Sequence, residues 1–293
     1  MISYNPKEWL SFIFSANRND TIRKLVPFLF LISAYTAGIV YLETQFLRFS
    51  EHSGFRHIGI THNLLGFVLS MLLVFRTNSA YDRWWEGRKL WGSLVNNSRN
   101  LALKLNALLG KDDQKERMFF SKTIPMYAQV LKDHLRSEKT RLELDQDQHP
   151  ELISIETSSH QPNHLMAILL ERLIELKRQK KISEEELLFM NQELQSFTEI
   201  CGACERIKNT PIPYSYSVFV KKFIFIYVIT LPFGFSFQLG FWMIPVVAFI
   251  FFVLGSLELI AEEIEDPFGG DENDIPTERI AEGIKKSVNE ILR

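Results

Sequence analysis

Residues 58–75 read IGITHNLLGFVLSMLLVF, a run without a charged residue. An α-helix needs about 20 consecutive, predominantly apolar residues to cross a bilayer. Leu25–Leu42, which precedes the run in the chain, is also uncharged and of similar length. A polar segment joins the two runs, so we predict that they form a first membrane hairpin.

A third apolar region, from Phe223 to Leu257, contains no charged residue and is too long for a single span. Pro232, Gly234 and Gly240 lie within it and favour a break in the helix. We therefore predict a second hairpin of two spans, with its turn near Ser236–Gly240. The chain then has four spans in total.

Basic residues beside the spans predict their orientation. Most of them lie before the first span, after the second span or before the third span: Arg23, Lys24, Arg76, Arg83, Arg88, Lys89, Lys221 and Lys222. The segment 43–57 carries Arg48 and Arg56 alone as Lys or Arg, and the turn of the second hairpin has no charge. Because basic residues are enriched on the cytoplasmic side, we predict a multi-pass protein of the cell (inner) membrane with both termini in the cytoplasm.

The composition fits a chain divided between membrane and water. A hydrophobic fraction of 46% is ordinary, and the mean hydropathy of -0.03 averages apolar regions near both ends with a charged stretch between them. The predicted segments are an N-terminal segment with the first hairpin, a cytoplasmic helical domain, the second hairpin, and a cytoplasmic C-terminal segment with an acidic loop. They cover residues 1–92, 93–214, 215–257 and 258–293.

The central region is predicted to form long amphipathic helices, since apolar residues recur there at three- and four-residue spacing. These helices cover Leu94–Leu109, Met118–Leu135, His164–Lys180 and Glu184–Ile200. Ser183 followed by Glu186 has the pattern of a capping box, and the polar stretch Asp145–Asn163 is predicted to be a loop. No strand-like alternation occurs. The predicted fold is all-α, with four transmembrane helices continuous with a helical cytoplasmic domain.

One face of residues 58–75 carries a stripe of large apolar side chains. Phe67, Met71 and Phe75 are four residues apart, so a helix places them on one face, and Gly66 directly precedes the first. The stripe has two interpretations. It packs against a neighbouring helix, or, repeated around a symmetric homo-oligomer, it forms hydrophobic rings that gate a pore by excluding water.

Three motifs resemble those of the bestrophin family, in particular its bacterial homologues. The first is FRTNSAYDRWWEGRKLWG at residues 75–92, the second combines CER at 204–206 with TPIP at 210–213, and the third is AEEIEDPFG at 261–269. Together with the order of the four spans, the resemblance covers nearly the whole chain.

The resemblance implies a homopentamer around one axial pore, with a narrow membrane neck and a cytoplasmic vestibule that ends in an aperture. Bestrophin necks are lined by three apolar residues four apart on the second span, the first directly after a glycine. This pattern falls on Phe67, Met71 and Phe75, with Gly66 as the register mark. The resemblance therefore favours the pore interpretation of the stripe.

The resemblance places the aperture near Glu185, where relatives often carry an aliphatic residue. The local sequence, residues 182–186, is ISEEE. If Glu185 faces the axis, a ring of carboxylates at the exit favours cations, whereas a shift of about one turn puts Ile182 there instead. The alternative is a solvated acidic helix start that complements the helix dipole.

The third motif implies a calcium site. Animal bestrophins clasp Ca²⁺ with an acidic run after an Asn-Pro-Phe-Gly motif, and the matching side chains here are Asp271, Asp274 and Glu263. Carboxylates and carbonyls at this spacing suit the six to eight oxygen ligands that Ca²⁺ takes. The acidic run is thinner than in animal members, and a solvated loop is the alternative. No cofactor is otherwise expected.

Charged residues alternate in sign just inside the predicted membrane boundary. Arg76, Arg83 and Arg88 are interleaved with Asp82 and Glu86. On a helix this pattern predicts partial pairing of charges along the helix. A ring of basic side chains that steers ions is the alternative.

The sequence does not predict an enzyme, because no P-loop, nucleophile motif or histidine-rich metal spacing occurs. Cys201 and Cys204 form a Cys-Gly-Ala-Cys motif, but two thiols do not complete a zinc site and no βαβ pattern surrounds them. We interpret them as half-buried helical cysteines. The formal net charge of -2 argues against a generally basic nucleic-acid-binding protein.

The leading prediction is a homopentameric channel that passes small monovalent inorganic ions through the neck, with a modest preference for cations. An anion channel for chloride with the same architecture is the alternative, because an apolar neck offers no fixed charge. A non-conducting membrane scaffold or assembly protein is the alternative from another class. The expected partners are further copies of the chain, the lipid bilayer and monovalent ions, and no nucleic acid.

Overall fold

The computed structural model describes three stretches of the chain: residues 21–47, 58–137 and 160–293. In these stretches every regular element is a helix and no strand occurs, which agrees with the all-α prediction. The described residues divide into two compact units. The apolar unit contains those of Ile2–Arg83 and Pro211–Glu265, and the amphipathic unit those of Trp84–Thr210 and Asp266–Arg293.

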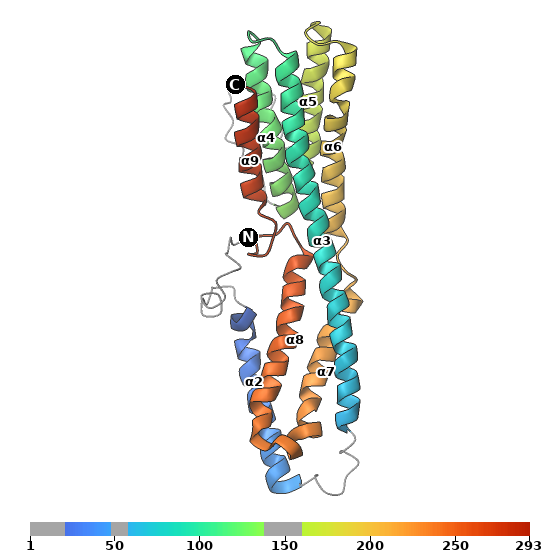
Figure 1. Cartoon of the computed structure of the whole chain (residues 1–293), viewed down its shortest axis with the longest axis vertical. Coiled ribbons are helices and arrows are strands. Elements are labelled where there is room, and N and C mark those ends of the chain that lie inside the picture. The colour runs from blue at the N-terminus through green and yellow to red at the C-terminus, as the bar shows by residue number, and fades with distance from the viewer. Residues whose placement is uncertain (1–20, 48–57, 138–159) are drawn as a thin grey trace. The chain divides into compact units, whose positions relative to one another are not determined.

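Four helices contribute to the apolar unit: α2 (Thr21–Leu42), the first part of α3 (Ile58–Leu108), α7 (Tyr214–Leu239) and α8 (Met243–Glu265). A π-helical turn, η1 (Glu43–Leu47), follows α2. Helices α2, α7 and α8 contact one another (Figure 1). The core of the unit consists of apolar side chains from all four helices, including Ile32, Val40, Leu69, Leu73, Val220, Ile224, Val228, Leu231, Met243 and Val247.

The second hairpin turns at the predicted place. A 3-10 turn, η4 (Gly240–Trp242), joins α7 to α8. Gly240 has a φ of 54°, which lies in the left-handed region that glycine adopts without a steric penalty. Pro232 lies inside α7 and does not end that helix, so the break falls on the glycine alone.

Three stretches of the described chain are long and apolar enough to cross a membrane: Thr21–Phe46, Gly59–Leu108 and Tyr214–Glu265. The last of these contains both α7 and α8. The helices therefore agree with the prediction of four spans in two hairpins.

Helix α3 runs unbroken for 51 residues. The sequence predicts helices at 58–75 and 94–109 that are continuous between membrane and cytoplasm, and the intervening residues contain no proline that would interrupt them.

In the amphipathic unit, Gly87 permits a close approach of the C-terminal segment. A Cβ at Gly87 would lie 3.0 Å from the ring of Phe268, which is tighter than van der Waals contact.

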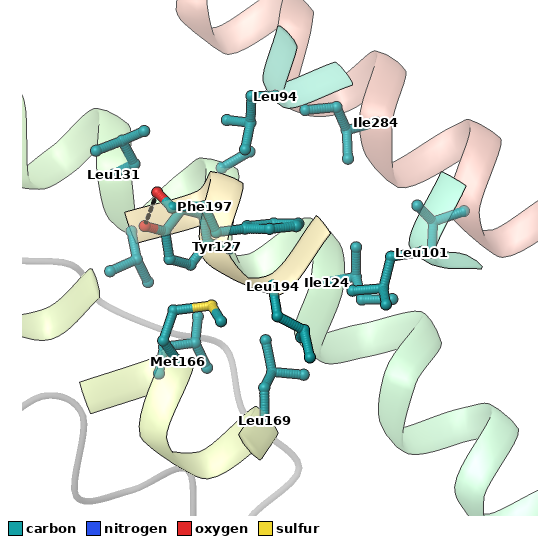
Figure 2. Close-up of a cluster of buried hydrophobic side chains, with 14 of the residues drawn as sticks. Leu94, Leu101, Ile124, Tyr127, Leu131, Met166, Leu169, Leu194, Phe197 and Ile284 are labelled. Carbon is teal, nitrogen blue, oxygen red and sulfur yellow. Dashed lines mark hydrogen bonds between the residues drawn. The ribbon is translucent and has the colours of Figure 1, made fainter. Parts of the chain in front are cut away.

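The amphipathic unit contains the second part of α3 and four more helices: α4 (Gln114–Arg136), α5 (Gln161–Arg178), α6 (Glu184–Asn209) and α9 (Thr277–Ile291). Figure 2 shows its core, where Tyr127, Phe197 and Ile284 lie among aliphatic side chains. The Tyr127 hydroxyl donates a hydrogen bond to the Phe197 carbonyl oxygen at 2.7 Å. The one polar atom that Tyr127 brings into the core is thus satisfied.

Helix α6 begins with the predicted capping box. The Ser183 hydroxyl accepts a hydrogen bond from the Glu186 N–H at 3.2 Å, and the Glu186 carboxylate accepts one from the Ser183 N–H at 2.6 Å. Most of the predicted loop 145–163 lies outside the described residues. At its end α5 has already begun at Gln161.

The C-terminal segment differs most from the prediction. Residues 258–293 do not form one segment, because α8 continues to Glu265 and the residues after it belong to the amphipathic unit. There α9 buries apolar side chains three and four residues apart, namely Ala281, Ile284 and Val288. Within α3 the boundary between the two units lies at Trp84, and the Trp84 indole donates a hydrogen bond to the Asn273 carbonyl at 2.9 Å.

Candidate functional site

Within the apolar unit, α3 has a buried face and an exposed face. The buried face is formed by residues that recur every three, four or seven positions: His62, Leu69, Leu73, Arg76 and Ala80. Gly66 continues this line, and a Cβ there would lie 2.6 Å from the hydroxyl oxygen of Tyr227 on α7. Any larger residue at Gly66 would therefore displace the Tyr227 side chain or push the two helices apart.

Phe67, Met71 and Phe75 lie on the other face of α3. Their side chains are 68%, 50% and 53% exposed. At 3.6 residues per turn, the centre of this stripe is about 180° around the helix from the centre of the buried line. Among the described residues, no helix of the same chain covers the stripe. If the stripe packs against one of the described helices, that helix must therefore belong to another subunit.

Arg76 follows the stripe directly but turns its side chain into the apolar unit, where it is 1% exposed. Its Nη2 lies 2.6 Å from Glu265 Oε2, and its Nε lies 3.6 Å from Glu258 Oε1. The first contact is a close ion pair, while the second is too long for a hydrogen bond. One buried arginine thus faces two carboxylates of α8.

Glu265 connects this charge cluster to the chain around it. Its Oε1 accepts a hydrogen bond from the Ile212 N–H at 2.7 Å, and its carbonyl oxygen accepts one from Arg83 Nε at 3.0 Å. The cluster therefore ties α3, the end of α8 and the segment that leads into α7. Sequence reasoning misses it, because the partners of Arg76 are far away along the chain.

Two of the alternating charges after the stripe are paired with residues of other helices. In the apolar unit Arg76 contacts Glu265, and in the amphipathic unit Arg206 Nη2 lies 2.7 Å from Glu86 Oε1. For Arg76 and Glu86 the partners seen in the structure therefore lie on other elements, while pairing of Asp82, Arg83 and Arg88 along α3 stays a prediction. The burial of Arg76 also excludes it from a ring of exposed basic side chains.

The start of α6 separates the two aperture candidates. Ile182 is 3% exposed and belongs to the hydrophobic core of the amphipathic unit. Glu185 is exposed. A side chain that lines an aperture must reach the surface of its protomer, and of the two candidates Glu185 is the one that does. An aperture at this position stays a prediction.

The three glutamates at the start of α6 have different surroundings. Glu184 pairs with Lys177 at 2.9 Å, and Glu186 belongs to the capping box. Hydrogen bonds from the Glu185 backbone N–H and from Ser183 hold the pKa of the Glu185 carboxyl below its usual value. Glu185 is therefore an exposed carboxylate that is ionised at neutral pH and that, among the described residues, has no lysine ion pair like that of Glu184.

Exposed apolar residues next to Glu185 are missed by sequence reasoning. Leu188 and Phe189, one turn further along α6, are 67% and 58% exposed. Lys104 Nζ lies 4.1 Å from the centroid of the Phe189 ring, a cation–π contact that partly covers this ring. Leu188 is thus an exposed aliphatic side chain on the surface of the amphipathic unit.

Two of the predicted calcium ligands lie in one loop of the amphipathic unit. The Asp271 N–H donates a hydrogen bond to Asp274 Oδ2 at 2.6 Å, and Asp274 Oδ1 is buried without a hydrogen-bond partner in the described structure. The third, Glu263, belongs to the apolar unit, where Lys24 Nζ lies 2.6 Å from its Oε1. An unpartnered buried carboxylate oxygen fits a site that takes a cation.

Cys201 and Cys204 are free thiols, and both are buried in α6. Burial raises the pKa of the Cys201 thiol to about 12 and that of the Cys204 thiol further above its usual value. A thiolate is required for metal binding and redox exchange. The structure thus agrees with the interpretation as helical cysteines, with fuller burial than predicted.

A sequence profile described as Bacterial/Fungal Bestrophin protein matches residues 1–290. The chain belongs to the bestrophin family. This bestrophin is 35% identical over 233 residues to a voltage-dependent anion channel-forming protein of Nostoc sp., covering 76% of this chain and 74% of the relative. It is 28% identical to the voltage-dependent anion channel-forming protein YneE of Escherichia coli, covering 97% and 92% of the two chains.

The bestrophin fold is also found in a solved structure, that of a bacterial bestrophin homologue from Klebsiella pneumoniae. The two chains share 24% identity with a TM-score of 0.80, over 92% of this chain and 98% of the other. Bestrophins are membrane proteins, and they are channels and not enzymes. The family and the fold class predicted from the sequence are thereby confirmed.

In this bestrophin the Asp274 carboxyl makes the acidic loop sensitive to pH. Burial raises its pKa to about 7, and the Asp271 and Asp266 carboxylates act in the same direction. Because the folded-state pKa exceeds the unfolded value, the folded protein holds a proton that the unfolded chain releases. The contribution of Asp274 to the free energy of unfolding therefore falls as pH rises from about 4 to about 7.

Asp274→Asn is expected to remove this loss, because an amide resembles the protonated carboxyl. At pH 8 the variant should exceed the parent in stability by roughly 2–4 kcal/mol, and at pH 4 the two should be alike. The measurement is the thermal unfolding midpoint of the detergent-solubilised chain between pH 4 and pH 8, without Ca²⁺. Asp112→Asn, in the turn before α4, serves as the control. Equal pH profiles of parent and Asp274→Asn would contradict the expectation.

Proposed function

We propose that this bestrophin is the subunit of a homopentameric channel for small inorganic ions in the cell inner membrane, with both termini in the cytoplasm. The observation that carries the proposal is the exposed stripe of Phe67, Met71 and Phe75 on α3. The face of α3 that packs within the chain lies about half a turn away from it. The stripe is thus available to surround an axis shared with other subunits.

Several subunits are required because one hairpin pair does not enclose a pore. In a cyclic assembly each position of α3 is repeated at equal distance from the axis. The three stripe residues then form three rings along the helix, about 6 Å apart at four residues of 1.5 Å rise. Apolar rings of this kind gate by excluding water, since an ion that sheds its hydration finds no polar replacement there.

The stripe leaves the sign of the permeant ion open, and two observations point in opposite directions. Glu185 is exposed, stays ionised and is the predicted aperture residue, which favours monovalent cations. The Nostoc and Escherichia coli relatives are named anion channel-forming proteins, which favours chloride or other anions. We propose the cation preference and treat anion selectivity as the second candidate.

Glu185→Gln tests the aperture and the sign together. In planar bilayers under a potassium chloride gradient, the parent is expected to show a reversal potential on the cation side. The variant loses the ring of carboxylates, so its permeability ratio should move to within about twofold of unity. Glu184→Gln is the matched control, because Glu184 is engaged by Lys177 and should leave the ratio unchanged.

Each outcome of this experiment decides one point. If the reversal potential of the parent lies on the anion side, the channel is anion-selective and the proposed cation preference is wrong. An unchanged ratio in Glu185→Gln would remove Glu185 from the aperture. Ion flux no greater than that of empty vesicles, for parent and variants alike, would favour the scaffold alternative over a channel.

The acidic loop supports a proposed Ca²⁺ site in the same protein. Asp274 and Asp271 would hold the ion, because a buried carboxylate oxygen of Asp274 lacks a partner in the described structure. A bound cation would offset the cost of ionising Asp274 in a buried position. The participation of Glu263 stays a prediction.

A further inference from the structure

A cluster of metal-ligand residues lies in the amphipathic unit, away from the stripe and the acidic loop. His134 is in the last turn of α4, His160 is the N-cap of α5, and Glu205 is on α6. The Nε2 atoms of His134 and His160 lie 2.6 Å and 3.0 Å from the same oxygen, Glu205 Oε1. The centroids of the two imidazole rings are 4.7 Å apart. Side chains from three helices therefore converge on one point.

We propose that His134, His160 and Glu205 form a binding site for a divalent transition-metal ion, with Zn²⁺ as the ion that fits it. Two imidazoles and a carboxylate are a ligand set that Zn²⁺ prefers, and three protein ligands leave a fourth position for water. One candidate ligand atom from each residue lies within 4.8 Å of the others. The residues are separated along the sequence, which is why no spacing motif reveals them.

The distances within the cluster suit a small ion after a slight expansion. Ligands bound tetrahedrally to Zn²⁺ at about 2.0–2.1 Å are about 3.3 Å from one another. The two imidazole–carboxylate distances of 2.6 Å and 3.0 Å are shorter, as expected for hydrogen bonds without a metal. An increase of less than about 1 Å makes room for the ion, which is within the reach of side-chain rotation.

The surroundings hold two of the ligands in place and leave them accessible. Lys208 on α6 donates hydrogen bonds to the Leu135 carbonyl and the Ser137 hydroxyl, which fixes the end of α4 beside α6. The side chains of His134, His160 and Glu205 are 25%, 34% and 29% exposed. An ion can therefore enter from solvent, while the partial burial keeps the ligands from being fully hydrated.

Metal binding has a local consequence at the start of α5. His160 Nδ1 accepts a hydrogen bond from the Asn163 N–H at 3.2 Å, so in the neutral ring the proton sits on Nε2 and points at Glu205. A metal ion on Nε2 displaces that proton, and the neutral ring then carries its proton on Nδ1. The bond from Asn163 must break. Zinc is thus expected to strengthen the link between α4, α5 and α6 while loosening one amide of the α5 N-terminus.

The test uses the full chain in detergent, treated with a chelator and then titrated with Zn²⁺ alone. Calorimetry is expected to show one tight site per chain, and the thermal unfolding midpoint should rise because the metal binds the folded state. His134→Gln and His160→Gln should each weaken this binding by about 100-fold or more. Two controls should bind zinc like the parent. One is His164→Gln, at a histidine of α5 outside the cluster, and the other is the Cys201→Ala/Cys204→Ala double variant.

A second measurement on the parent keeps the test decisive if a variant does not fold. X-ray absorption of the zinc-loaded chain should show imidazole ligands with nitrogen or oxygen neighbours at about 2.0–2.1 Å and no sulfur. Amide exchange at Asn163 should become faster with zinc. The proposal would be overturned if the parent does not bind zinc, or if both histidine variants bind it as tightly as the parent. Loss of binding in the cysteine variant, or sulfur in the metal shell, would also overturn it.

Discussion

Simultaneous replacement of Phe67, Met71 and Phe75 by alanine is expected to raise the basal ion conductance of the assembled protein by about tenfold or more. Each tenfold gain corresponds to a barrier that is lower by about 1.4 kcal/mol. Three rings of large apolar side chains exclude water from the axis in the parent. Alanine widens each ring and lets water enter. A tenfold gain therefore requires each ring to lower the barrier to conduction by only a fraction of a kcal/mol.

The stripe is suited to such a substitution because it does not hold the chain together. Its side chains are largely exposed in the protomer, and the buried face of α3 supplies the packing. The alanine variant should therefore fold and assemble, and single-channel recording in planar bilayers measures its conductance. A variant with three exposed apolar residues of α2, Phe28→Ala, Phe30→Ala and Leu31→Ala, is the matched control and should conduct like the parent.

The opposite result has a clear meaning. If the stripe variant is as quiet as the parent while the oligomer remains intact, the stripe contacts lipid or a neighbouring subunit and does not gate. An increase of equal size in the α2 variant would indicate a general loosening of the membrane helices.

Arg76→Met is expected to destabilise the protein by about 3–5 kcal/mol, the typical cost of removing one partner from a buried ion pair. Methionine replaces the length of the side chain but leaves Glu258 and Glu265 without their positive partner. Arg76 Nε and Nη1 lack hydrogen bonds in the described structure, so the network is imperfectly satisfied and the lower end of the range is expected. The thermal unfolding midpoint and the fraction of intact oligomer in detergent measure the effect.

A double-variant cycle separates the ion pair from simple loss of packing. Glu265→Gln combined with Arg76→Met removes both charges of the 2.6 Å pair, and it should recover part of the stability that Arg76→Met loses. The Ile212 N–H retains an oxygen acceptor in the glutamine variant. Additive effects of the two substitutions, or a parent-like midpoint for Arg76→Met, would contradict a coupled buried cluster.

The membrane helices and the stripe can be predicted from the sequence because their signals are local. An uncharged run of sufficient length predicts a span, and the four-residue spacing of Phe67, Met71 and Phe75 predicts a common face. Ser183 and Glu186 reveal their capping box within four residues. Gly66 is recognised as a register mark, although its close approach to Tyr227 is visible in the structure alone.

The remaining features depend on contacts between distant parts of the chain. In the sequence Arg76 is one basic residue among several. Nothing near it indicates that its side chain is buried against the carboxylates of Glu258 and Glu265. Ile182 is a single apolar residue among polar ones, so its burial follows from the packing of the amphipathic unit. The apolar residues of helix α9 recur with helical spacing, so this helix could be predicted from the sequence. The partners against which it packs could not be predicted, because they lie far away along the chain.

In the proposed pore, Phe67, Met71 and Phe75 of several identical subunits face one shared axis. A cryo-electron microscopy reconstruction of the detergent-free protein in lipid nanodiscs, viewed along the membrane normal, would show this arrangement. We predict five-fold symmetry with the three side chains of each α3 forming successive rings around a central pore. A monomer, or an oligomer in which these side chains face lipid or a sealed subunit interface, would contradict the account.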